Sequence, residues 1–154
     1  QTGWVLTEQA NFQLQPARMN DLNALHRLEH ECFDRDAWPL LDLIGVLTIP
    51  GVVRIKAVVD GEMIGFISGE IDRARKLGWV TTVGVRPQYR GKGIATALLQ
   101  ACERDMNVPC IRLCVRWNNQ SALNLYARNG YRQVDRWHAY YQDGEDAFVL
   151  EKCR

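Results

Sequence analysis

The chain has 154 residues, 47% of them hydrophobic and 24% charged, as expected of an ordinary globular domain that holds a core without a disulfide or metal. Its 19 Lys and Arg nearly balance its 18 Asp and Glu, which argues against the basic excess typical of nucleic-acid or membrane-surface binding. Fifteen of the 19 cations are arginine, the side chain that best matches phosphate and carboxylate groups.

The first half of the chain predicts a strand, two helices and a hairpin. Apolar residues alternate with glutamines just before Pro16, as in a short strand, and apolar residues at helical spacing follow the N-cap candidates Asn20 and Asp21. Asp60-Gly61 separates two β-branched runs and is a strong hairpin signal. The predicted elements are a strand at 12–15, helices at 22–32 and 40–47, and strands at 52–59 and 62–71.

The second half alternates strands and helices and ends in a hairpin around Asp143-Gly144. Gly130 lies just beyond the last predicted helix, where a left-handed glycine commonly ends a helix. No repeat or linker interrupts the chain, so we expect a single domain over 1–154. This order predicts a mixed α/β sheet of about seven mostly antiparallel strands, flanked by about four helices. The predicted elements are a strand at 79–85, a helix at 94–105, a strand at 109–117, a helix at 121–128, and a hairpin of 132–141 with 146–152.

The five cysteines form an odd, irregularly spaced set, which favours a reducing, cytoplasmic location over a secreted disulfide scaffold. Cys110 and Cys114 lie in a predicted strand and lack the loop spacing of a zinc knuckle, so no metal is expected. The residues up to Phe12 contain no basic start followed by an apolar core, so no secretory signal is expected. The apolar stretch from Trp38 to Val53 is too interrupted to span a membrane.

Residues 83–99 predict a strand that passes through a turn of small residues into an amphipathic helix. Small residues at 91, 93 and 95 let a ligand approach the backbone, and the unpaired N–H groups of a helix start attract anions. Arg86, Arg90 and Lys92 place three cations beside these groups. The turn is therefore expected to bind phosphate.

Several interpretations of this turn compete. It is not a P-loop, because Lys92 is followed by Gly93 instead of Ser or Thr and position 86 is Arg. A Rossmann fingerprint is matched at two of three positions only, and in the middle of the chain. An ordinary glycine-containing loop that precedes a helix is the remaining alternative.

Two motifs together resemble a known family. Residues 90–95, RGKGIA, resemble the Arg/Gln-x-x-Gly-x-Gly/Ala acetyl-CoA signature of the GNAT superfamily of N-acetyltransferases. About thirty residues later, the run from Asn119 to Tyr126 with Gly130-Tyr131 resembles the family's second block, Asn-x-x-Ala-x-x-Leu-Tyr followed by Gly-Phe/Tyr. The resemblance covers about residues 11–152 and implies the acyl-CoA N-acyltransferase fold.

Within the superfamily the chain is most similar to the protein N-terminal acetyltransferases, including the ribosomal-protein-alanine type. Residues 29–33 leading to Ala37-Trp38-Pro39, and the run YYQDGEDA at 140–147, support this. The resemblance implies direct transfer from acetyl-CoA to an amine, without a covalent enzyme intermediate. The partner would be a protein or peptide N-terminus, with no nucleic acid or membrane involved, and the enzyme would be a monomer or homodimer.

The resemblance also implies roles for individual residues. Backbone N–H groups at 90–95 would hold the pyrophosphate, strand residues Val83 and Val85 would run beside the pantetheine, and an N–H near Val83 would steady the thioester oxygen. Asn119 would position the cofactor arm or cap its helix, and Tyr126 would protonate the departing thiolate or pack in the core. Trp38, Tyr140 and Tyr141 would flank the acceptor amine. The implied cofactor-binding set is Val83, Val85, Arg90, Gly91, Lys92, Gly93, Ile94, Ala95, Thr96, Asn119 and Tyr126.

The general base is not identified by the sequence. Many relatives have a carboxylate or His on the strand equivalent to 79–85, which here has neither. The candidates are Glu70, which we take as the catalytic choice, and Asp34, Asp36 and His138. Weak base machinery favours an α-amino acceptor, because its pKa of about 7.7–8.0 leaves far more neutral amine at pH 7 than the about 10.4 of lysine.

Two other functions stay open. The chain is alternatively an acetyltransferase for a small-molecule amine such as a polyamine, an amino sugar or an amino acid. A non-catalytic acyl-CoA-binding module is the third interpretation, and the presence of Asn119 and Tyr126 argues against it.

Overall fold

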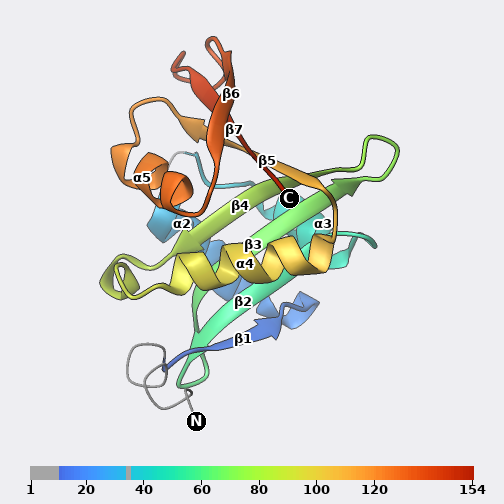
Figure 1. The fold of residues 1–154 in the computed structure, drawn as a ribbon. Coiled ribbons are helices and arrows are strands. Elements are labelled where there is room, and N and C mark those ends of the chain that lie inside the picture. The colour runs from blue at the N-terminus through green and yellow to red at the C-terminus, as the bar shows by residue number, and fades with distance from the viewer. Residues whose placement is uncertain (1–10, 34–35) are drawn as a thin grey trace.

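A computed structural model describes residues 11–33 and 36–154, which build a seven-stranded sheet with helices on both faces (Figure 1). The strand order is β1-β2-β3-β4-β5-β7-β6, and every neighbouring pair is antiparallel except β4 with β5. The elements are β1 (Gln13–Pro16), η1 (Met19–Asp21), α2 (Leu22–Phe33), α3 (Leu40–Thr48), β2 (Val53–Val59), β3 (Glu62–Asp72), β4 (Leu77–Val85), η3 (Pro87–Tyr89), α4 (Ile94–Met106), β5 (Cys110–Arg116), α5 (Gln120–Arg128), β6 (Arg132–Trp137) and β7 (Ala147–Cys153).

The predicted mixed α/β sheet and the order of its elements are confirmed, with most boundaries within two residues. The last hairpin differs, because its first arm ends at Trp137 instead of Tyr141. Ala139 has a left-handed φ of 50°, and its N–H donates to Asp146 Oδ1 at 2.9 Å, which turns the chain out of the strand. Tyr140 therefore lies in the connection between β6 and β7.

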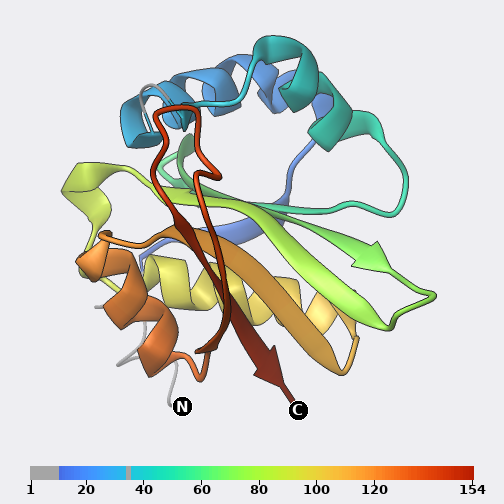
Figure 2. The same ribbon diagram turned by 90° about the horizontal axis from the view of Figure 1, so that it is seen from above.

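The sheet separates two hydrophobic cores, as Figure 2 shows with α2 and α3 on one face and α4 and α5 on the other. Leu98 and Leu99 of α4 are fully buried against the sheet, and Leu25 and Leu43 pack around Phe66 on the opposite face. Helix α4 lies so close to the sheet that a Cβ at Gly78 would be 2.7 Å from a Met106 sulfur. In the described part of the chain, no helix is both long and apolar enough to cross a bilayer.

Strands β4 and β5 diverge after a short paired segment. Their parallel register extends only from Leu77 and Cys110 to Trp79 and Arg112. A bulge then leaves Thr81 without a register partner on β3, and its hydroxyl bonds to the hydroxyl and carbonyl oxygens of Ser68 at 2.7 and 3.2 Å. Residues 80–85 therefore present a strand edge that β5 does not pair, which opens the middle of the sheet.

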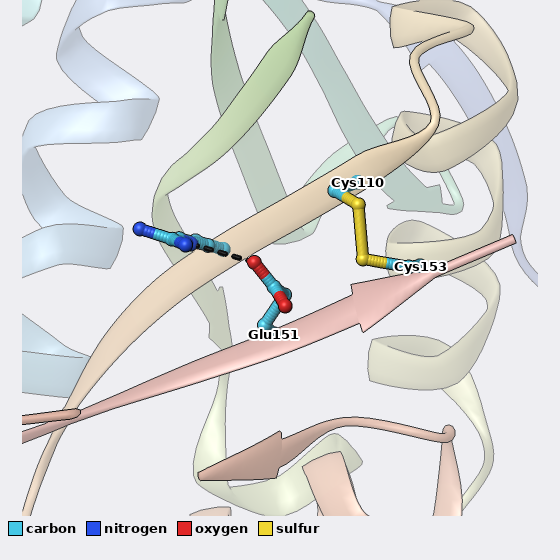
Figure 3. The surroundings of a disulfide bond; sticks show 4 residues. Cys110, Glu151 and Cys153 are labelled. Carbon is cyan, nitrogen blue, oxygen red and sulfur yellow. Dashed lines mark hydrogen bonds and ion pairs between the residues drawn. A yellow bond between two sulfur atoms is a disulfide. The ribbon is translucent and has the colours of Figure 1, made fainter. Parts of the chain in front are cut away.

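Two of the five cysteines form a disulfide, which their irregular spacing did not predict. Cys110 begins β5 and Cys153 ends β7, and antiparallel register places them opposite each other across 43 residues of sequence (Figure 3). Glu151 lies beside them and accepts a hydrogen bond from Arg112 at 2.8 Å. Both sulfurs of this group are already bonded to each other, so it offers no thiolate pair for a metal.

Candidate functional site

The turn before α4 exposes unpaired backbone donors. Gly91 and Gly93 have φ values of 78° and 81°, and no atom lies within 4 Å of the Cβ position at either residue. Gly93 is the N-cap of α4 and supplies no side-chain cap, and the first intrahelical bond is donated by Ala97 to the Gly93 carbonyl at 3.1 Å. The N–H groups of 94–96 are thus left for an external acceptor, with the positive end of the helix dipole behind them.

The three cations predicted to surround this turn have different environments. Arg86 is paired with Glu62 at 2.9 Å and with Glu31 at 3.6 Å, so it braces the β3–β4 region instead of facing the turn. Arg90 donates from Nε to the Val85 carbonyl at 3.0 Å, and Lys92 lies over the Tyr89 ring at 5.9 Å. Lys92 has no carboxylate within ion-pair distance among the described residues, which leaves its charge for an anionic ligand.

Helix α5 packs beside the start of α4. Asn119 caps α5 by accepting the Ala122 N–H at 3.2 Å, as local sequence predicts, and Asn129 donates to Thr96 Oγ1 at 3.2 Å. Tyr126 lies on α5 and is buried, with its ring 6.0 Å from that of Tyr131. Burial, with a smaller contribution from nearby Tyr141, raises the pKa of Tyr126, so its hydroxyl keeps its proton at neutral pH.

An aromatic pair lies in the connection between β6 and β7. Tyr140 is 51% exposed, and its ring meets that of Tyr141 edge to face at 5.0 Å. Burial raises the pKa of Tyr141 to about 12. Tyr141 is near enough to Tyr126, 15 positions away in sequence, to contribute to the raised pKa of that residue. Trp38 lies on the α2–α3 connection, which is linked to this hairpin through Arg116, because that side chain bonds to both Asp36 and Asp143.

The candidates for the general base lie in different places. Glu70 is exposed on β3, opposite Trp79 and four positions along β4 from Val83. His138 is 80% exposed and lies 3.3 Å from Asp146, while Asp36 is bound by Arg116. Asp34 lies outside the described residues. None of the three described candidates is hydrogen-bonded to Tyr126, Tyr140 or Tyr141 in this part of the chain.

Three residues of this region were not singled out by sequence. Cys114 on β5 contributes to the raised pKa of both Tyr140 and Tyr141. Burial raises the pKa of Cys114 itself to about 11, so the thiol stays protonated near neutral pH. Arg116, two positions later, stacks 4.3 Å over the Tyr141 ring. Glu29 is 2% exposed and accepts hydrogen bonds from the Trp38 N–H and the Thr82 hydroxyl. A signal existed for Glu29, since it is a carboxylate on the apolar stripe of α2.

Glu29→Gln is expected to raise the free energy of unfolding at pH 7. Burial raises the pKa of Glu29 above its ordinary 4.5, only partly opposed by its two hydrogen bonds, so the folded state binds the proton more tightly than the unfolded state. The free energy of unfolding therefore falls as pH rises from 4.5 through the raised pKa. At neutral pH the wild type bears the cost of the ionised, buried Glu29 carboxylate. Denaturant unfolding at several pH values should show a gain for the variant at pH 7 that shrinks toward pH 4.5; a gain independent of pH would contradict this.

Comparison with known proteins gives consistent similarities. The model of the Acetyltransferase (GNAT) family matches residues 19–131. The chain is 31% identical to an N-alpha-acetyltransferase of Sulfurisphaera tokodaii, over 90% of this chain and 91% of that protein. Its fold is similar to that of the ribosomal-protein-S18-alanine N-acetyltransferase from Escherichia coli, with a TM-score of 0.82, 21% identity and coverage of 92% and 93%. It is also similar to Arabidopsis thaliana NAA60 in complex with acetyl-CoA, with a TM-score of 0.81, 24% identity and coverage of 92% and 98%.

Proposed function

Because this chain belongs to the acetyltransferase (GNAT) family, we propose that its acceptor is the α-amino group of a protein or peptide N-terminus. Membership makes it an acetyl-CoA-dependent N-acetyltransferase, which moves an acetyl group from acetyl-CoA to an amine. The acceptor class is supported by the N-alpha-acetyltransferase of Sulfurisphaera tokodaii, to which the chain is similar over nearly its whole length.

The turn of residues 90–96 fits the pyrophosphate of acetyl-CoA. Its N–H groups at 94–96 have no side-chain cap, and two left-handed glycines leave room for close approach. Lys92 adds a charge without a carboxylate partner among the described residues.

The unpaired edge of β4 at Val83 would run beside the pantetheine. Asn119 accepts the Ala122 N–H at the start of α5, and this hydrogen bond would hold its side chain facing the cofactor arm. The Val85 carbonyl oxygen already accepts hydrogen bonds from Arg90 and Cys32. Val85 would therefore contact the pantetheine through other atoms of its main chain.

Acetyl-CoA supplies the activated acetyl group as a thioester. The acceptor nitrogen bonds to the carbonyl carbon while the carbon–sulfur bond breaks, and the nitrogen loses one proton to water. A backbone N–H near Val83 would donate to the thioester oxygen as it gains charge. Tyr126 would donate a hydrogen bond and its proton to the departing sulfur, for which its buried, protonated hydroxyl is suited.

The single observation that best supports an α-amino acceptor is that, among residues 11–33 and 36–154, the groups near Tyr140 and Tyr141 that could act as a base are protonated or already paired. The thiol of Cys114 is protonated there, and the hairpin carboxylates are engaged: Asp143 with Arg116, Glu145 with Trp117, and Asp146 with Arg136. An α-amine with a pKa of about 7.7–8.0 is already partly neutral at pH 7, whereas a lysine near 10.4 needs on the order of 3–4 kcal/mol more to be deprotonated.

The proposal predicts that peptides are acetylated and that the rate follows the titration of the peptide itself. With N-terminal peptides, polyamines, amino sugars and free amino acids as acceptors, release of the CoA thiol should be fastest with peptides. At subsaturating peptide, the rate should rise about tenfold per pH unit below the acceptor's pKa and level off above about pH 8. Turnover with small amines alone would contradict the peptide acceptor, and acetyl-CoA binding without turnover by any amine would favour the binding module.

A further inference from the structure

Two groups of polar contacts reach the α2–α3 connection, one from β4 and one from β5. In the first, the Thr82 hydroxyl of β4 donates to Glu29 Oε2 at 2.9 Å. The other oxygen of Glu29 accepts the N–H of Trp38 at 3.2 Å. A single buried carboxylate thus ties the α2–α3 connection to the diverging strand β4.

The same connection is tied to β5 by a second contact. Arg116 donates from Nε and Nη2 to the two carboxylate oxygens of Asp36 at 2.7 and 2.8 Å, the bidentate geometry that holds a carboxylate most firmly. Its third nitrogen donates to Asp143 at 3.0 Å, in the tip of the β6–β7 hairpin. Figure 2 shows this hairpin reaching up to the α2–α3 connection across the edge of the sheet.

We propose that Glu29 and Arg116 are positioning residues that together hold both walls of the acceptor groove. One wall is the connection at Asp36 and Trp38, and the other is the hairpin with Tyr140 and Tyr141. This inference rests on the proposed function, because it takes these walls as the place where the acceptor binds. Neither residue reaches the reacting atoms in this assignment; each acts on the acceptor through the segments it fixes.

The two anchors are suited in different ways to hold the walls before an acceptor arrives. Glu29 is 2% exposed, so water competes weakly for its hydrogen bonds. Arg116 lies nearer the surface, and its bidentate pairing with Asp36 holds that contact. Arg116 also stacks over the Tyr141 ring at 4.3 Å, which restrains that ring in the hairpin. An acceptor that meets preformed walls loses less conformational freedom on binding. Neither anchor contacts the turn at 90–96, so acetyl-CoA affinity should be nearly independent of them.

Arg116→Gln tests the β5 anchor, and Arg112→Gln is its matched control. Both arginines lie on β5 four positions apart, so their side chains point to the same face of the sheet. Both pair with a carboxylate, but the partner of Arg112 is Glu151 of β7, at 2.8 Å, which belongs to neither wall. We expect Arg116→Gln to raise the acceptor KM roughly tenfold and to leave the acetyl-CoA Kd, measured by calorimetry, within about twofold. Arg112→Gln should leave both constants within about twofold of wild type.

Thr82→Val and Glu29→Gln test the β4 anchor. The valine keeps the strand and its shape but removes the hydroxyl donor, whereas glutamine can still accept from Trp38 and donate to Thr82. Thr82→Val should therefore raise the acceptor KM and Glu29→Gln should not. Because both anchors hold one connection, Thr82→Val combined with Arg116→Gln should raise KM by less than the product of the single effects.

Two results would overturn the inference, once thermal unfolding shows that the variants fold. One is an unchanged acceptor KM in Arg116→Gln. The other is a loss of acetyl-CoA affinity in that variant as large as its rise in acceptor KM. Failure of the proposed function is separate, because it appears in the wild type as no turnover of peptides. The variants are then assayed with the amine that the wild type does accept, and the same criteria decide.

Discussion

Tyr126→Phe is expected to lower kcat roughly 100-fold, because the variant cannot donate a proton or a hydrogen bond to the departing sulfur. The acetyl-CoA Kd should stay within about twofold, since phenylalanine preserves the ring that packs beside Tyr131. Burial raises the pKa of Tyr126, so the wild type has a protonated donor there over the working range, and the variant has none. Single-turnover release of the CoA thiol measures the chemical step directly.

Tyr131→Phe is the matched control for this experiment. Tyr131 packs against Tyr126, but its hydroxyl donates to the buried Glu103 at 2.7 Å, in the core under α4. Its loss should lower the free energy of unfolding by about 1–3 kcal/mol, because Glu103 loses a partner, and should leave kcat within about threefold. An equal fall of kcat in both variants would mean that Tyr126 acts through packing, and an unchanged kcat in Tyr126→Phe would remove its role as acid.

The parts of the fold that depend on neighbouring residues were predictable from sequence. Asp60-Gly61 specified its hairpin through two left-handed residues, with φ values of 50° and 79°, and Asn119 specified the start of α5 through its side-chain cap. The turn at 90–96 was predictable for the same reason, since its glycines and the following apolar helix are contiguous. Local backbone chemistry decides all three.

Contacts between distant segments were not predictable in this way. The register of β5 with β7 pairs Cys110 with Cys153, and nothing near either cysteine indicates it. The charge of Arg86 was predicted to face the turn, but the packing of β3 beside β4 brings Glu62 to it first. Likewise, the bidentate contact of Arg116 with Asp36 crosses 80 positions and depends on the divergence of two strands.

Because the turn at 90–96 is built by its own glycines, replacing them is expected to have a large effect on cofactor binding. Gly91→Ala combined with Gly93→Ala should weaken acetyl-CoA binding roughly 100-fold. Each alanine must adopt a left-handed φ, at a cost of about 1–2 kcal/mol, and each adds a methyl group where the pyrophosphate is proposed to approach the backbone. Calorimetric titration with acetyl-CoA and with CoA measures the loss, which should be similar for both because they share the pyrophosphate.

Gly51→Ala combined with Gly61→Ala separates backbone strain from ligand contact. These glycines have φ values of 83° and 79°, and like the pair in the turn they have no atom within 4 Å of the Cβ position, so the two double variants should lose similar stability. Gly51 follows α3 and Gly61 lies in the β2–β3 hairpin, outside the proposed cofactor set. Only the variant of the turn should lose acetyl-CoA affinity. If the two double variants bound acetyl-CoA with equal affinity, the pyrophosphate would have to bind elsewhere, because backbone strain is the only effect that the two variants share.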